Sequence, residues 1–184
     1  MSGKKTVRFV TYTAMGIALV VAAQWLGNVL PAGAVIAGPF AVKQLVTGSL
    51  VNCVLYVFTG AVGILSGVVI GLLSSLLAFL FGIGPILPVV PVVACGNALL
   101  CLVFGLLRKS GKLPAVVDVI LSALLKCGFL WLLVPMVARA AGVPAKQVGA
   151  LSIMFSWPQA ITALIGGLLA LVILGRLKKS SKHD

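Results

Sequence analysis

A single lysine inside an apolar run is the residue of this chain best placed to do chemistry. Lys126 lies near the middle of the run from about 115 to 141, and Asp118 lies eight residues earlier. On a helix that separation spans about 12 Å, too far for an easy direct pair. Lys126 therefore either snorkels or pairs elsewhere, or it faces an internal pocket and meets an anionic ligand. In the first alternative, Asp118 caps its helix and pairs with a loop cation such as Lys112.

Polar side chains inside other apolar runs are further candidates for ligand contacts, because such residues are expensive in a membrane. Asn52 and Asn97 lie in two separate runs, and Trp157 and Gln159 flank Pro158 in the last run. Proline frees a backbone carbonyl and kinks a helix. The aromatic ring and the amide beside it are either a ligand wall or neighbours of a kink that binds nothing.

Three cations lie near the predicted external ends of the runs: Lys43, Arg139 and Lys146. They are either solvated charges among lipid headgroups or charges that attract an anionic substrate toward a cavity mouth. The sequence offers little for other chemistry, since its four cysteines form no CxxC pair and its one histidine, His183, lies in the polar tail. We therefore expect no metal, no cofactor and no enzymatic activity.

The composition indicates which elements hold these residues. The chain has 184 residues, of which 61% are hydrophobic and 9% are charged, whereas a soluble domain has roughly 25% charged residues. This excludes an ordinary soluble domain and a disordered chain. The excess of 14 Lys and Arg over 2 acidic residues, a net charge of +12, could indicate nucleic-acid binding. Cations that flank and orient membrane spans explain it more simply, so we expect a lipid bilayer and no nucleic acid as surroundings.

The apolar runs predict an all-α integral membrane protein with about six transmembrane helices in one domain, residues 1–184. A helix needs about 20 apolar residues to cross a bilayer. The runs are continuously apolar rather than alternating, which excludes barrel strands. The expected spans are about 8–30, 45–60, 63–81, 89–107, 115–141 and 147–174.

The distribution of cations predicts that both termini are cytoplasmic. With the N-terminus inside, ten cations fall in cytoplasmic segments and three in external loops, as the positive-inside rule favours. The ten are Lys4, Lys5, Arg8, Arg108, Lys109, Lys112, Arg176, Lys178, Lys179 and Lys182.

Two rows of small residues at four-residue spacing provide smooth strips that another helix can approach closely. They are Ala14, Ala18 and Ala22 in the first span, and Gly63, Gly67 and Gly71 in the third. For the glycine row we expect packing between helices of this same chain.

The chain resembles the substrate-binding S components of energy-coupling factor (ECF) vitamin transporters over nearly its whole length. The shared features are its small size, about six spans, the basic N-terminus and the alanine row on the first helix. Three stretches also look like the family, namely residues 46–56, 88–97 and 155–159. No Walker A motif is present in the sequence, as expected for this family.

The resemblance implies a function without catalysis. An S component binds a vitamin or related small molecule at its external face with high affinity. It docks on a transmembrane coupling subunit that carries two cytoplasmic ATPases, and the whole component is thought to topple in the membrane. Carried over, Ala14, Ala18 and Ala22 become the docking strip, and the location becomes a prokaryotic plasma membrane. The pantothenate-type branch looks closest, with folate, riboflavin, cobalamin, thiamine precursors and queuosine precursors also open.

The family's pocket is built from the outer halves of the later helices and from the loop after the first helix. In this sequence that region includes the segment from Gly38 to Gln44. The substrate-binding residues it indicates are Lys43, Gln44, Asn97, Lys126, Trp131, Arg139, Trp157 and Gln159. Two alternatives remain, a self-sufficient small transporter or channel and a membrane scaffold that transports nothing.

Overall fold

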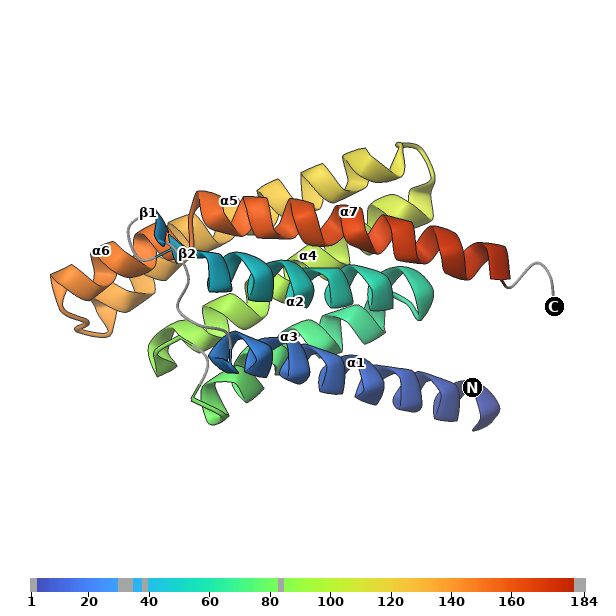
Figure 1. The fold of residues 1–184 in the computed structure, drawn as a ribbon, viewed down its shortest axis with the longest axis horizontal. Helices are drawn as coiled ribbons and strands as arrows, with labels where there is room; N and C mark the ends of the chain where they lie inside the picture. The colour runs from blue at the N-terminus through green and yellow to red at the C-terminus, as the bar shows by residue number, and fades with distance from the viewer. Residues whose placement is uncertain (1–2, 30–34, 38–39, 83–84, 181–184) are drawn as a thin grey trace.

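The computed structural model describes residues 3–29, 35–37, 40–82 and 85–180, and these are almost entirely helical (Figure 1). A short antiparallel hairpin, β1–β2, precedes the second helix. In chain order the elements are α1 (Gly3–Val29), β1 (Val35–Ala37), β2 (Phe40–Ala41), α2 (Val42–Ala61), α3 (Ile64–Leu80), the 3₁₀ turn η1 (Leu87–Val89), α4 (Val90–Ser110), α5 (Ala115–Ala140), α6 (Ala145–Met154) and α7 (Trp157–Ser180).

Five helical segments are long and apolar enough to cross a membrane. They are Thr6–Gly27, Val42–Ala61, Leu87–Ser110, Ala115–Ala140 and the combined stretch Ala145–Ser180. Helix α3 is also apolar but has only 17 residues. The chain is therefore an all-α, multi-pass membrane protein.

The last predicted span, 147–174, is two helices in the structure. Helix α6 ends at Met154 and α7 begins at Trp157, so the break precedes Pro158. Pro158 occupies the second position of α7, where the backbone N–H that proline lacks would have no helical partner in any case. The proline thus begins a helix instead of kinking one.

The two ends of the helix bundle, which Figure 1 shows, differ in the charged residues that they carry. The start of α1, the α2–α3 junction, the α4–α5 turn and the end of α7 lie at one end, which we call the basic end. The hairpin and α6 lie at the other, which we call the hairpin end. The described cations of the basic end are all exposed: Arg8, Arg108, Lys109, Lys112, Arg176, Lys178 and Lys179.

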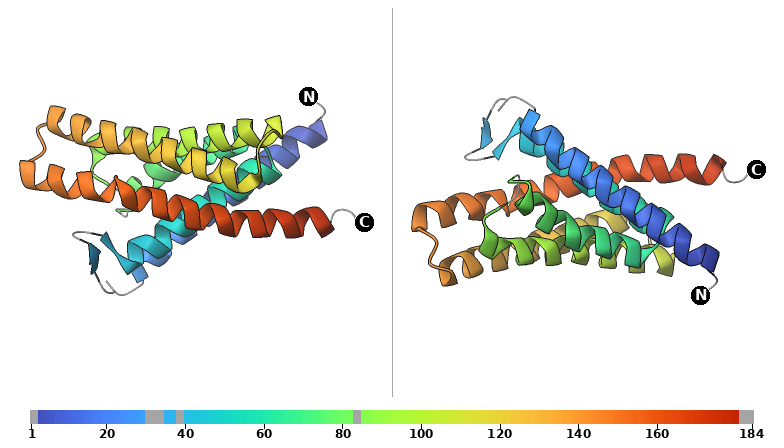
Figure 2. Two further views of the ribbon diagram at one scale, coloured as in Figure 1. Left: turned by 90° about the horizontal axis from the view of Figure 1, so that it is seen from above. Right: turned by 90° about the horizontal axis from the view of Figure 1, so that it is seen from below.

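Helices α2 and α7 form the most extensive helix pair of the bundle. Their backbones touch at Gly166, where an added Cβ atom would lie 2.5 Å from the Ser49 carbonyl oxygen and 2.7 Å from the Cys53 amide nitrogen. Helix α1 packs along α2, and the two cross the direction of α4, α5 and α7 obliquely (Figure 2). The close contact fixes the register in which α2 and α7 present their side chains to each other.

The glycine row on α3 packs inside the molecule, as predicted. Gly67 lies against the side chain of Thr59, and Gly71 lies against the α4 backbone at Asn97. Gly63 has no atom within 4 Å of where its Cβ would be, so only two of the three glycines serve this contact.

Candidate functional site

A cavity of about 180 Å³ lies at the hairpin end, between the start of α2, the end of α6 and the start of α7. Neutral polar and apolar side chains line it together. The lining residues are Phe40, Gln44, Thr47, Gly48, Met154, Phe155, Gln159 and Thr162.

Aromatic rings form one wall of this cavity. Phe40 is buried and packs edge-on against Trp157, with 5.5 Å between the ring centroids. The hairpin brings Phe40 to the start of α2, and the α6–α7 break brings Trp157 to the start of α7. Edge-to-face pairs of this kind are favourable beyond the area they bury, so the pair stabilises the mouth of the cavity.

Amide and hydroxyl groups form the polar part of the lining. Gln44 Oε1 accepts a hydrogen bond of 2.9 Å from the backbone N–H of Ala41, which leaves the amide NH₂ of Gln44 for other partners. Gln159 Nε2 donates to the Met154 carbonyl at 3.3 Å and so bridges the break between α6 and α7. The hydroxyl oxygen of Thr47 is buried and has no hydrogen-bond partner among the described residues.

Lys126 lies directly behind this lining, with only 2% of its surface exposed. Its Nζ atom donates to Asn52 Oδ1 at 2.7 Å. Asn52 Nδ2 in turn donates to the Gly48 carbonyl at 2.9 Å and to Thr162 Oγ1 at 3.3 Å. Since Gly48 and Thr162 both line the cavity, Asn52 connects the buried ammonium group to the cavity wall.

Asp118 is engaged elsewhere and does not neutralise Lys126. It is fully buried, and its Oδ2 atom lies 3.4 Å from Arg108 Nη1. Asp118 thus pairs with a cation near the α4–α5 turn, as expected, but this cation is Arg108 in the last turn of α4 and not Lys112. The predicted capping role is wrong, because the N-cap of α5 is Pro114 and no side chain that the structure describes caps the helix. Among the described residues, Lys126 has no acidic partner.

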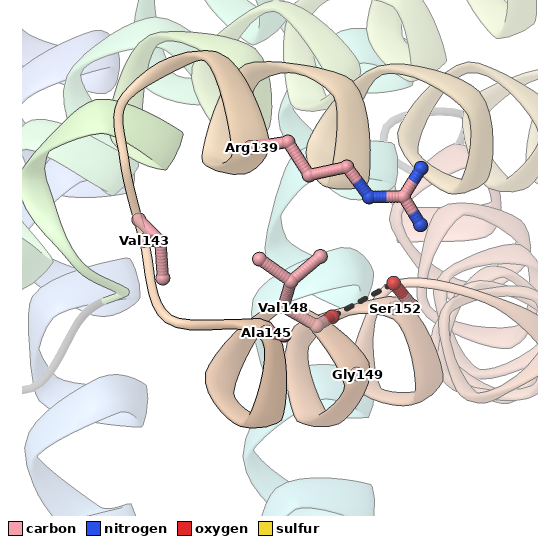
Figure 3. A pocket seen from close by; sticks show the side chains of 6 residues that line it. All are labelled: Arg139, Val143, Ala145, Val148, Gly149 and Ser152. Atoms are coloured by element: carbon pink, nitrogen blue, oxygen red, sulfur yellow. Dashed lines mark hydrogen bonds between the residues drawn. The ribbon is translucent and has the colours of Figure 1, made fainter.

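Arg139 lines a second cavity, of about 370 Å³, between the end of α5 and α6 (Figure 3). Figure 3 shows its guanidinium group extending above α6, where Ser152 Oγ donates to the Val148 carbonyl at 2.8 Å. The other lining residues are Val143, Ala145 and Gly149. No residue of this lining belongs to the first cavity, so the structure separates Arg139 from the other predicted site residues.

The eight predicted site residues thus fall into two groups. Gln44 and Gln159 line the first cavity, Trp157 packs on its wall and Lys126 lies behind it. The other four lie apart from it. Asn97 donates to Ser74 Oγ and Ser75 Oγ at the α3–α4 contact. Trp131 is 63% exposed on α5, and Lys43 is half-buried in the first turn of α2, outside the lining. Arg139 lines the second cavity. Of the predicted segment 38–44, Gly38 and Pro39 are outside the described residues.

Phe40 belongs to the predicted segment 38–44 and lines the cavity. Other lining residues were missed by the sequence analysis, among them Thr47, Met154, Phe155 and Thr162. Asn52 was recognised as a costly polar residue but was not selected as part of the site. Its signal was available, because an amide within an apolar run needs a partner. The identity of that partner, Lys126, depends on packing between α2 and α5 and has no local sequence signal.

The alanine row lies on the outer face of α1. Ala14, Ala18 and Ala22 are all exposed, whereas the opposite face packs into the bundle, for example through the 2.8 Å hydrogen bond between the hydroxyl groups of Thr13 and Ser66. The row therefore makes no major contact within the described chain, and its role in docking stays a prediction.

The arrangement at the hairpin end is suited to binding a small molecule. It combines a concave space, an aromatic wall and a few convergent polar groups, which is the usual make-up of a ligand site. No family model matches the chain, and no curated protein and no solved structure matches it either. The functional argument therefore depends on the geometry of this cavity and on the sequence resemblance.

Proposed function

We propose that this chain is the membrane-embedded substrate-binding subunit of an uptake system for a vitamin or related small molecule, of the ECF S-component type. The observation that carries the proposal is the cavity at the hairpin end, with Lys126 buried behind it. An ionisable residue within a membrane span is a candidate for a functional site by default, because its burial there is costly. The resemblance already assigned Gln44, Trp157 and Gln159 to such a pocket, and these residues lie at this cavity.

The size of the cavity supports a small ligand. Sites for drug-sized molecules have volumes of about 300–1,000 Å³, and this one has about 180 Å³. Among the substrates left open by the resemblance, pantothenate and the precursors of thiamine and queuosine are smaller than folate, riboflavin and cobalamin and fit such a space better. Within that smaller group, the sequence resemblance to the pantothenate-type branch makes a pantothenate-like substrate our proposal.

The proposed partners are a transmembrane coupling subunit and its two cytoplasmic ATPases. The exposed row Ala14, Ala18 and Ala22 supports this, because a strip of small residues lets another helix approach closely. The gathering of cations at the basic end supports cytoplasmic termini by the positive-inside rule. In this proposal, the hairpin end faces outward from a prokaryotic plasma membrane.

Two measurements test the proposed function. Native mass spectrometry of the purified protein should detect a bound small molecule that can be extracted and identified. In the native host, Ala18→Trp should abolish uptake of that molecule without changing its binding, because Ala18 is exposed and far from the cavity.

Leu169→Trp is the matched control, since Leu169 is 46% exposed on α7 and gains a similar ring outside the alanine row. It should leave both uptake and binding intact. A purified protein that never holds a small molecule would refute the proposal in favour of a scaffold. Transport in liposomes that contain this protein alone would refute it in favour of a self-sufficient transporter.

A further inference from the structure

A directed chain of hydrogen bonds runs from Lys126 to the wall of the cavity. An ammonium group can only donate, so Asn52 must present its oxygen to Lys126 and its NH₂ to Thr162. Thr162 Oγ1 accepts from Asn52 and donates onward to the Gln159 carbonyl at 3.2 Å. Each link therefore passes its proton away from Lys126, the last one onto the backbone of α7, and linked bonds of this kind polarise one another.

The charge at the start of this chain has no counterion among the residues that the structure describes. Lys126 is 2% exposed and makes one hydrogen bond among the described residues. Of the two acids in the sequence, Asp118 is paired with Arg108, and Asp184 lies outside the described residues. An isolated buried charge is costly, so an anion at the other end of the chain would meet an uncompensated positive potential.

The cavity lining has room for an anion and contains no acid to repel one. Its polar members are two amides and two hydroxyls. Thr162 is the end of the chain from Lys126. Thr47 also lines the cavity, and its buried hydroxyl oxygen, which faces Gly27 of α1, has no hydrogen-bond partner among the described residues.

We propose that the ligand of this cavity is a small organic anion whose carboxylate binds at Thr162. Thr162 turns its hydroxyl from the Gln159 carbonyl to the carboxylate, and Asn52 acts as a positioning residue that transmits the charge of Lys126. The aromatic lining at Phe40 and Phe155 then receives the uncharged part of the molecule. This inference rests on the proposed function, in that it takes the cavity to be the substrate site.

A thermal-stability assay with matched probes tests the charge of the ligand. The purified protein in detergent is incubated with carboxylates from acetate to pantothenate, each beside its neutral alcohol or amide, such as panthenol for pantothenate. A ligand that binds the folded state raises Tm in proportion to its occupancy. We expect at least one carboxylate to raise Tm and to bind about tenfold or more tightly than its neutral counterpart. This ratio is what the neutral probe should lose when it cannot form one charge-assisted hydrogen bond.

Three variants test the route from Lys126. Lys126→Met and Asn52→Leu should each abolish the preference for carboxylate over neutral probe, a ratio that a merely structural defect would not change selectively. Asn97→Leu is the matched control, because Asn97 is another buried amide but lies at the α3–α4 contact. It should keep the preference. If Asn52→Leu does not fold, the double variant with Lys126→Met replaces it.

The outcomes separate this inference from the proposed function. Neutral probes that bind as tightly as carboxylates, or a preference that survives Lys126→Met, overturn the inference and leave the proposed function standing. If no probe binds and native mass spectrometry finds no bound molecule, both fail. If no probe binds but a neutral molecule co-purifies, only the inference fails.

Discussion

The contact between Lys126 and Asn52 makes a strong prediction about stability. Asn52→Leu removes the one hydrogen-bond acceptor that the described structure provides for the buried ammonium group. Lys126→Met removes the charge itself. We expect the first change to destabilise the ligand-free protein strongly, and the second change, added to the first, to restore most of the lost stability.

The magnitudes follow from burial and from the 2.7 Å separation of Lys126 Nζ and Asn52 Oδ1. Leaving a buried charged group without its hydrogen-bond partner costs about 3 kcal/mol or more. Lys126→Met alone leaves Asn52 Oδ1 unpaired, at a cost of about 1–3 kcal/mol. The same substitution also removes a lysine whose placement at a helix centre costs about 2.5–3.5 kcal/mol. The net change in the free energy of unfolding on Lys126→Met is therefore about zero. Replacing both partners should be nearly neutral.

A double-mutant cycle measures this coupling. The free energy of unfolding of wild type, both single variants and the double variant is determined by reversible unfolding in mixed micelles. We expect a coupling energy of about 3 kcal/mol, with the double variant close to wild type. If Asn52→Leu costs the same whether residue 126 is Lys or Met, then the ammonium does not depend on Asn52 and the reasoning is refuted.

Two further predictions concern the packing and the charges of the bundle. Gly166→Ala should lower the free energy of unfolding by about 1–3 kcal/mol, because the added methyl group meets the α2 backbone. Gly175→Ala on the same helix adds its methyl group to open space and should be neutral or slightly stabilising. Equal effects at both sites would contradict the close contact. Arg108→Met should cost about 2 kcal/mol because it leaves Asp118 buried without its cation. Lys109→Met serves as the exposed control, and unfolding measurements that rank it equal to Arg108→Met would show that the ion pair contributes nothing.

The membrane character and the approximate helices could be predicted from the sequence, because an apolar run of about 20 residues has few alternatives to a spanning helix. The importance of Lys126 was also evident, since a cation in the middle of such a run is conspicuous. The break between α6 and α7 could be predicted only in part from the sequence. Pro158 marks the place, but proline is equally compatible with a kink and with a helix start.

The composition of the site could not be predicted in the same way. Asn52 and Asn97 look alike in the sequence, as each is an amide within an apolar run. Only the packing separates them, because α2 brings Asn52 to Lys126 while α4 brings Asn97 to two serines of α3. The hydrogen bond between Asn52 and Thr162 joins residues 110 positions apart, and its register is set by the contact at Gly166.

Packed core separates the cavity at the hairpin end from the basic end of the bundle. The fully buried side chains of this core include Leu55, Tyr56, Phe104 and Val119. A ligand of this cavity would then enter and leave at the hairpin end. An obstruction on that path that does not touch the bound ligand raises the free-energy barrier to entry and the barrier to exit by the same amount. Association and dissociation would slow by the same factor, so equilibrium affinity would stay constant while the time needed to fill or empty the protein grows.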